Sequence, residues 1–138
     1  MAFELLDHPA DVKFRATGST RSAAFASVVD ALAAVVGTTV IDAPARERAV
    51  SVVSESVEAL VFDFLAELLF VQDVDGVAVA SVSDLEITEV PDGLRLTGTL
   101  SVVPIPPDRP LADVKAPTYS ELSVTEDDGW TIEAVLDV

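Results

Sequence analysis

The sequence predicts an α+β fold in which two helices pack on a largely antiparallel β-sheet. Two segments in the first half carry apolar residues at helical spacing, and a strand-like segment precedes each of them. From residue 77 onward the segments are strand-like and are separated by turn residues. Strands and helices followed by a run of antiparallel strands are typical of α+β proteins. The 138 residues, half of them hydrophobic, suit a single domain that spans 1–138.

The N-terminal part predicts two strands and a helix. Phe3 to Leu6 is a short apolar strand, and Val12 to Thr17 alternates apolar with polar side chains. A turn that contains proline separates them. Thr20 is a suitable N-cap for the helix that follows, and Gly37 stands where a C-cap glycine is expected. Because this helix is rich in alanine and poor in charge, we expect neighbouring elements to cover both of its flanks.

A strand within Arg46 to Ser54 and a second helix follow. We expect Ser54 to cap this helix, and we expect the helix to end before a turn at residues 73–76. Its predicted buried face carries apolar residues at helical spacing: Val57, Leu60, Val61, Phe64, Leu65, Leu68 and Leu69. Asp63 and Glu67, four residues apart, are expected on the solvated outer face.

The second half predicts only strands, over residues 77–82, 85–90, 94–103, 112–124 and 130–138. The sequence Pro-Asp-Gly at residues 91–93 predicts a hairpin turn. Residues 103–110 contain four prolines and no alternation, which predicts a loop. Asp-Asp-Gly at residues 127–129 predicts the turn that joins the last two strands.

The charge of the chain limits its partners. Asp and Glu number 24 against 8 Lys and Arg, which gives a net charge of −16. This balance opposes direct nucleic-acid binding, because a phosphate-binding surface needs a basic patch. The acids are spread along the chain and repel one another, whereas at molar salt the Debye length is only about 3 Å. We therefore favour adaptation to a salty, halophile-like cytoplasm over an acidic surface made for a basic partner at low salt.

Several function classes lack their motif in this chain. There is no nucleotide-binding glycine pattern, no Gly-Lys-Ser/Thr loop and no Gly-x-Ser-x-Gly elbow. With no Cys and one His, disulfides, thiolate sites and His-based metal clusters are excluded. No apolar run reaches the ~18 residues of a membrane span, and the start of the chain does not have the pattern of a signal peptide. We expect a cytoplasmic protein without membrane contact.

Carboxylates remain as the candidates for chemistry. Asp7, His8 and Asp11 lie in one short turn, and Asp137 is adjacent to the terminal carboxylate of Val138. Such oxygen ligands suit hard cations, for example Ca²⁺, Mg²⁺ or Mn²⁺. Each cluster also has an ordinary explanation, because an Asp in a turn usually bonds the backbone and a terminal carboxylate is usually solvated. The sequence does not say whether the two clusters meet in space.

Four single residues have two interpretations each. Lys115, one of two lysines, could hold a phosphate or pair with the acids, or it could form an ordinary surface ion pair worth ~0–1 kcal/mol. His8 could be a ligand or carry a proton, although hydrogen bonding within its turn is the favoured role. Tyr119 and Trp130 are interpreted as packing residues rather than as a platform for base stacking.

Taken together, these segments resemble the archease family. The matching segments are Asp-His-Pro-Ala-Asp at 7–11, Phe25 in the first helix, 60–69 in the second helix, Val-Lys-Ala-Pro-Thr-Tyr at 114–119, Trp130, and Asp-Val at 137–138. They occur in the order found in the family and span nearly the whole chain. The sequence departs from the family at Pro9, where Thr is usual, and at Ala26, where many members carry Glu.

The resemblance implies an accessory protein that is not itself an enzyme. Archease proteins assist the RtcB-type ligase, which joins tRNA halves in tRNA splicing with Mn²⁺ and GTP, by promoting its guanylylation and repeated turnover. Members bind a divalent cation, seen as Ca²⁺, through acidic residues, which match Asp11, Asp137 and the adjacent Val138. Lys115 falls in a family motif and, with Asp7 and His8, is a candidate contact to phosphate or ligase.

Two other function classes stay open at this stage. The chain could be a stand-alone metal-dependent phosphoryl-transfer enzyme, or an acidic, chaperone-like interaction module. Replacement of Asp11 and Asp137 separates the interaction module from the other two classes, because only the module predicts no loss of function. Addition of the ligase separates the accessory protein from the stand-alone enzyme, because only the enzyme predicts activity without it.

Overall fold

The computed structural model describes residues 2–7, 11–38, 41, 43–107 and 114–138. Its elements are β1 (Phe3–Leu6), β2 (Val12–Gly18), α1 (Arg21–Val36), β3 (Arg46–Ser54), α2 (Val57–Asp75), β4 (Val77–Val90), β5 (Gly93–Pro104), β6 (Ala116–Glu126) and β7 (Trp130–Asp137). All strand pairs in this part of the chain are antiparallel. The predicted α+β class, with two helices packed on antiparallel strands, is confirmed.

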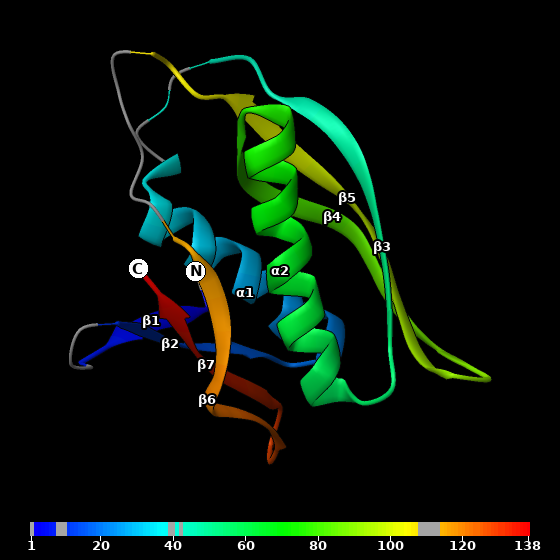
Figure 1. The fold of residues 1–138 in the computed structure, drawn as a ribbon. Coiled ribbons are helices and arrows are strands. Elements are labelled where there is room, and N and C mark those ends of the chain that lie inside the picture. Colours follow the sequence, from blue (N-terminus) through cyan, green and yellow to red (C-terminus); the bar gives the residue numbers. More distant parts are fainter. Residues whose placement is uncertain (1, 8–10, 39–40, 42, 108–113) are drawn as a thin grey trace.

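The strands form two sheets that share the two helices (Figure 1). One sheet has the order β1-β2-β7-β6, and the other has the order β3-β5-β4. Helix α1 packs against β2 of the first sheet and β4 of the second, and α2 packs against β6 and β3. Each helix therefore joins the two sheets, and the core lies between helices and strands.

Helix α1 has the predicted ends. The side chain of Thr20 accepts a hydrogen bond from the main-chain amide of Ala23, and Gly37 closes the helix in the left-handed conformation with φ of 91°. Nine of the 16 residues of the helix are buried, which fits a helix covered by strands of both sheets. The expectation of covered flanks is confirmed.

Helix α2 begins later and ends later than predicted. Ser56, not Ser54, caps it, because Ser54 is still part of β3 and pairs with Leu94. The helix continues past the expected turn to Asp75, and Gly76 ends it with φ of 65°. Asp63 and Glu67, expected on a solvated face, are both half-buried, and the Ser54 hydroxyl donates a 2.6 Å hydrogen bond to the Asp63 carboxylate.

The strand boundaries also differ in the second half. The two strands expected over residues 77–90 are one strand, β4, which bulges where Asp84 adopts a φ of 53°. The strand predicted over 112–124 begins at Ala116 and extends to Glu126, and residues 112–113 lie outside the described part of the chain. β5 runs one residue beyond its predicted end, to Pro104, while 108–110 of the predicted loop are also outside the described residues.

One hydrophobic core holds the elements together. Its largest fully buried side chains include Phe14 of β2, Phe25 of α1 and Phe64 of α2. The rings of Phe25 and Phe64 lie 6.2 Å apart, so the two helices meet inside the core. In the described part of the chain, neither helix is long and apolar enough to cross a membrane.

Candidate functional site

The register of β2 and β7 brings together the two acids that the sequence singled out. Val12 is paired with Leu136 in the antiparallel ladder. Asp11 comes directly before Val12 and Asp137 directly after Leu136, so both lie at the same end of neighbouring strands. Asp11 is half-buried, while Asp137 is exposed. The two clusters, far apart in the sequence, thus meet at one end of the sheet, and Asp7, Asp11 and Asp137 are called the acidic edge below.

The other predicted site residues lie close to this edge, apart from one that is not described. Asp7 follows β1, whose last pair is Leu6 with Lys13, and is exposed. The main-chain amide of Lys115 donates a 2.8 Å hydrogen bond to the carbonyl oxygen of Asp137. Val138 is 40% exposed. His8 lies outside the described residues.

The acidic edge offers carboxylate oxygens, a type of ligand atom that suits a hard cation. Carboxylate oxygens are the ligands that Ca²⁺, Mg²⁺ and Mn²⁺ prefer, and Mg²⁺ usually keeps several of its waters. In the parts of the chain that the structure describes, however, no group of three or more Asp, Glu or His side chains is arranged to hold a metal ion. A cation at this edge would therefore use Asp11 and Asp137 together with other oxygens, such as water or the carboxylate of Val138.

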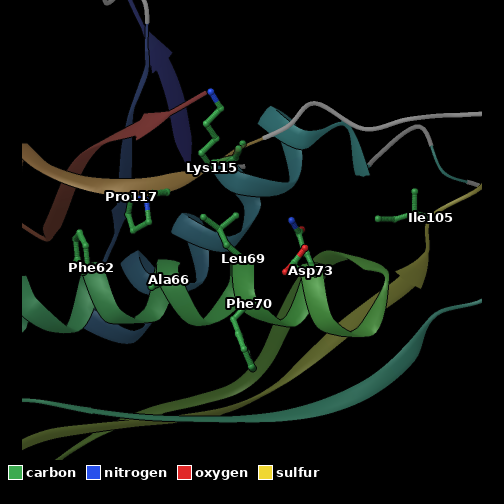
Figure 2. A pocket seen from close by; sticks show the side chains of 11 residues that line it. Phe62, Ala66, Leu69, Phe70, Asp73, Ile105, Lys115 and Pro117 are labelled. Atoms are coloured by element: carbon green, nitrogen blue, oxygen red, sulfur yellow. The ribbon is translucent and has the colours of Figure 1, made fainter.

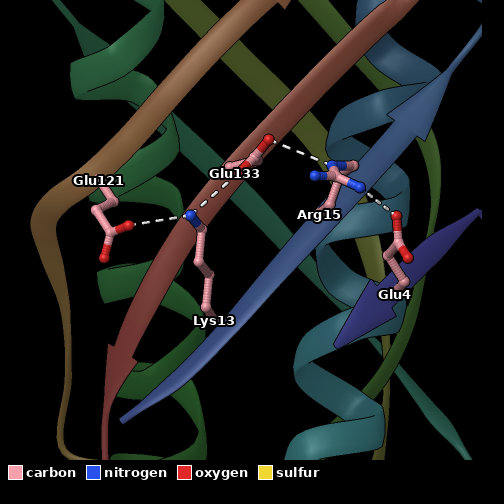
Figure 3. A network of polar contacts seen from close by, with 5 residues as sticks. All are labelled: Glu4, Lys13, Arg15, Glu121 and Glu133. Carbon is pink, nitrogen blue, oxygen red and sulfur yellow. Dashed lines mark hydrogen bonds and ion pairs between the residues drawn. The ribbon is translucent and has the colours of Figure 1, made fainter. Parts of the chain in front are cut away.

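A chain of ion pairs lies across the same sheet (Figure 3). Lys13 pairs with Glu121 at 3.1 Å and with Glu133 at 3.2 Å, and Arg15 pairs with Glu133 at 3.2 Å and with Glu4. The strand alternation that the sequence predicted puts Lys13 and Arg15 on one face of β2. Their acidic partners come from β1, β6 and β7, so the network links all four strands of the sheet.

The ion pairs shift the proton equilibria of their members. Burial raises the pKa of Glu133, but the hydrogen bonds from Lys13 and Arg15 outweigh burial, and the net effect is a lowered pKa. Hydrogen bonds to Glu121 and Glu133 raise the pKa of Lys13. Elsewhere, burial raises the pKa of Asp30 in α1. The ammonium group of Lys13 is thus ion-paired within the network, whereas Lys115 makes no ion pair with any described residue.

A groove of about 710 Å³ lies between α2 and the segment that leads into β6. Figure 2 shows Phe62, Ala66 and Leu69 on the side of α2 that faces Lys115 and Pro117. Asp73 and Ile105 lie at the other end of the same groove. The sequence analysis did not predict this groove. Of its residues, Leu69 was assigned to the buried face of the helix, and Lys115 was the only one singled out for a contact.

Two aromatic residues have roles close to those predicted. Tyr119 packs on Phe62 with ring centroids 4.2 Å apart and ring planes 5° apart, although 58% of Tyr119 is exposed. Trp130 is partly buried against the core, and the guanidinium of Arg21 lies 5.8 Å from the centre of its ring. Both act as packing residues in the structure, while the position of Tyr119 beside the groove could not be inferred from the sequence.

Comparison with known proteins assigns a family to nearly the whole chain. Residues 3–138 match the profile described as the Archease protein family (MTH1598/TM1083). The chain is 34% identical to protein archease of Methanothermobacter thermautotrophicus, over 92% of this chain and 91% of that protein. It is 30% identical to protein archease of Methanosarcina barkeri, over 99% of this chain and 95% of that protein.

Solved structures show the same fold. The solution structure of Methanobacterium thermoautotrophicum protein 1598 superimposes with a TM-score of 0.83 at 31% identity, over 99% of both chains. The crystal structure of an archease from Thermotoga maritima, described as a possible chaperone, superimposes with a TM-score of 0.65 at 20% identity. That alignment covers 96% of this chain and 94% of the other chain, and it supports the fold alone.

Proposed function

The chain belongs to the archease family, and from this we propose that it is an accessory protein of tRNA splicing that activates an RtcB-type RNA ligase. The observation that carries the proposal is the register of β2 and β7, which places Asp11 beside Asp137. These are the residues that the family resemblance marks as metal ligands. In this proposal the ligase performs the chemistry, and the present chain promotes its guanylylation and its repeated turnover.

We propose that Asp11 and Asp137 hold a divalent cation at the acidic edge, with the α-carboxylate of Val138 as a third anionic group. Ca²⁺, Mg²⁺ and Mn²⁺ are the candidate ions, and such an ion would neutralise phosphate charge during guanylyl transfer. Asp11 is half-buried and directly precedes β2, and Asp137 is the last residue of β7, so the register of the two strands sets the spacing of their main chains. Asp7 and His8 are proposed as further contacts to the ligase.

Lys115 supplies the positive charge of the proposed site. Its main-chain amide is bound to Asp137, and its exposed side chain makes no ion pair within the described residues. An ammonium group without a partner can approach a phosphate or an acidic side chain of the ligase. The net charge of −16 favours contact with a basic protein surface over direct contact with RNA.

The proposal is tested by multiple-turnover RNA joining with the RtcB-type ligase from the same source. The reactions contain GTP and Mn²⁺, and the present chain is added as the wild type, Asp11→Asn or Asp137→Asn. We expect stimulation by the wild type and its loss in both variants. Asp92→Asn, in the exposed turn between β4 and β5, is the control with the same change of charge and should stimulate normally.

The other function classes predict different outcomes of this experiment. A stand-alone phosphoryl-transfer enzyme would act without the ligase. An interaction module whose acids serve only solubility would tolerate both replacements at the acidic edge. Absence of stimulation by the folded wild-type protein would contradict the proposal itself.

A further inference from the structure

Helix α2 has a stripe of groove-lining residues, three apolar and one acidic, that borders its core-facing side. Phe62, Ala66, Leu69 and Asp73 follow one another at spacings of four, three and four residues, which places them along one side of the helix. All four line the groove, and Figure 2 shows them facing the segment that leads into β6. Since a helix rises 1.5 Å per residue, the stripe is about 16 Å long. This is the length of three helical turns.

The opposite wall of the groove comes from Val114–Pro117. Val114 and Pro117 are buried, whereas Lys115 is exposed. Two large apolar side chains near the groove are exposed: Phe70 is 56% exposed, and Tyr119, which stacks on Phe62, is 58% exposed. Large apolar side chains exposed next to a groove are typical of a surface that binds another protein.

The groove carries two charges that no described residue neutralises. Asp73 is exposed and makes no ion pair with the described part of the chain, and the same holds for Lys115 on the facing wall. By contrast, Asp75, two residues further along α2, is paired with Arg48 at 2.7 Å. Asp73, on the side of α2 that faces the groove, marks where a ligand would carry a basic group.

Lys115 also connects the groove to the acidic edge. Lys115 is one of the residues that line the groove, although Figure 2 shows its side chain extending away from α2, and its main-chain amide is bound to the carbonyl oxygen of Asp137. The groove and the acidic edge are therefore neighbours in the fold, joined through this residue.

We propose that this groove binds an amphipathic helix of the partner protein, with apolar side chains along its inner face and a basic residue opposite Asp73. The partner is the ligase, so this inference rests on the proposed function and adds a second contact to the acidic edge. The helical form follows from the straight stripe of about three turns, into which residues at positions i, i+3 or i+4, and i+7 of a helix fit.

The charge of the chain determines the charge of the helix. At low ionic strength a net charge of −16 attracts a basic segment and repels an acidic one, whereas at molar salt only charges in close contact, such as Asp73 with a basic side chain, have this effect. A nucleotide in the groove is also disfavoured, because Lys115 is the single cation among the described residues that line the groove and would have to balance the phosphate charge alone. A second copy of this chain would bring a further −16 and is disfavoured for the same reason.

The absence of cysteine allows a direct footprint of the groove. Ala66→Cys places one thiol in the groove, and Ser51→Cys places one on the exposed face of β3 as the control. The rate of maleimide labelling is measured with and without the cognate ligase. With ligase at about ten times its Kd, we expect labelling at position 66 to slow roughly tenfold, since only the unbound fraction reacts. Labelling at position 51 should not change.

A charge reversal gives an independent test. Asp73→Lys is compared with Asp92→Lys, which changes the net charge equally but lies in the remote turn between β4 and β5. We expect Asp73→Lys to weaken ligase binding roughly tenfold more than Asp92→Lys does, because it opposes the basic residue of the partner helix.

The outcomes separate this inference from the proposed function. Stimulation of the ligase without protection at position 66 would overturn the groove proposal and leave the proposed function intact. Protection without stimulation would support the groove and contradict the proposed function. Protection by GTP alone would indicate a nucleotide, and protection that depends only on the concentration of this chain would indicate a second copy; either result overturns the proposal. Failure of the ligase to bind would overturn both.

Discussion

The main-chain amide of Lys115 donates a 2.8 Å hydrogen bond to the carbonyl oxygen of Asp137. This bond ties the segment before β6 to the end of β7, next to the paired residues Ala116 and Asp137. The acidic edge and one wall of the groove therefore share a backbone contact. A partner that displaces the backbone of the acidic edge would therefore also displace this wall of the groove, and the reverse holds as well.

Glu133 makes the stability of the first sheet dependent on pH. Its pKa is lowered in the folded protein, so its contribution is present above its ordinary value of 4.5 and is lost as the pH falls through the folded value. We expect Glu133→Gln to lower the free energy of unfolding by about 0.2–1 kcal/mol at pH 7, the range for ion pairs near the surface. Near pH 2 the difference should shrink.

Urea unfolding at the two pH values measures this difference. Glu47→Gln, on the exposed part of β3, is the control and should change stability little at either pH. An equal loss for Glu133→Gln at both pH values would show that packing of the side chain, rather than its charge, stabilises the sheet.

Asp30 has the opposite pH dependence. Burial raises its pKa above the ordinary value of 3.8, so the folded state favours the protonated form. Stability from this group is therefore complete below pH 3.8 and is lost as the pH rises through the folded pKa. We expect Asp30→Asn to raise the melting temperature at pH 7 and to leave it nearly unchanged at pH 3. A lower melting temperature at pH 7 would mean that the charged form is stabilised instead.

Gly93 begins β5 in a position that excludes a side chain. Its φ is 138°, and a Cβ atom there would lie 2.1 Å from the carbonyl oxygen of Ser54. Backbone strain of this kind costs about 1–3 kcal/mol. We expect Gly93→Ala to destabilise the fold by more than that, because the clash with Ser54 adds to the strain. Gly76→Ala is the matched variant, because its φ of 65° carries strain but its Cβ would meet no atom within 4 Å. Chemical unfolding should rank Gly93→Ala as the more severe change.

The net charge of −16 predicts stabilisation by salt. Repulsion between the acids opposes folding at low ionic strength and is screened within about 3 Å at 1 M salt. We expect the melting temperature to rise when the KCl concentration is raised from 0.1 M to 2 M, because the Debye length falls from about 10 Å to ~3 Å or less over this range. A melting temperature that stays constant or falls would contradict adaptation to a salty cytoplasm.

The sequence predicts most elements of the fold because their signals are local. Thr20 and Gly37 define the ends of α1 through cap geometry, which depends on a few neighbouring residues. The predicted start of α2 was wrong because Ser54 and Ser56 are both suitable N-cap residues. What decides between them is the pairing of Ser54 with Leu94, a contact between strands that no local pattern contains.

The candidate site depends on contacts that are distant in the sequence. The sequence identifies Asp11, Asp137 and Lys115 as unusual residues, but only the β2–β7 register and the bond from Lys115 bring them together. The groove combines Ile105, the segment leading into β6 and one side of α2. Leu69, which the sequence predicts on the buried face of the helix, is partly buried against the core, and it also lines the groove. Helical spacing shows that a residue is apolar and on one side of a helix, but not everything that faces it.

Guanylylation of the RtcB-type ligase is the step at which the acidic edge is proposed to act. Transfer of labelled GMP to the ligase is followed with wild-type protein, with Asp137→Asn and with the control Asp92→Asn. We predict that the wild type and Asp92→Asn accelerate guanylylation and that Asp137→Asn does not. Equal acceleration by all three proteins would contradict a role for the acidic edge, and no acceleration by the wild type would contradict the accessory function.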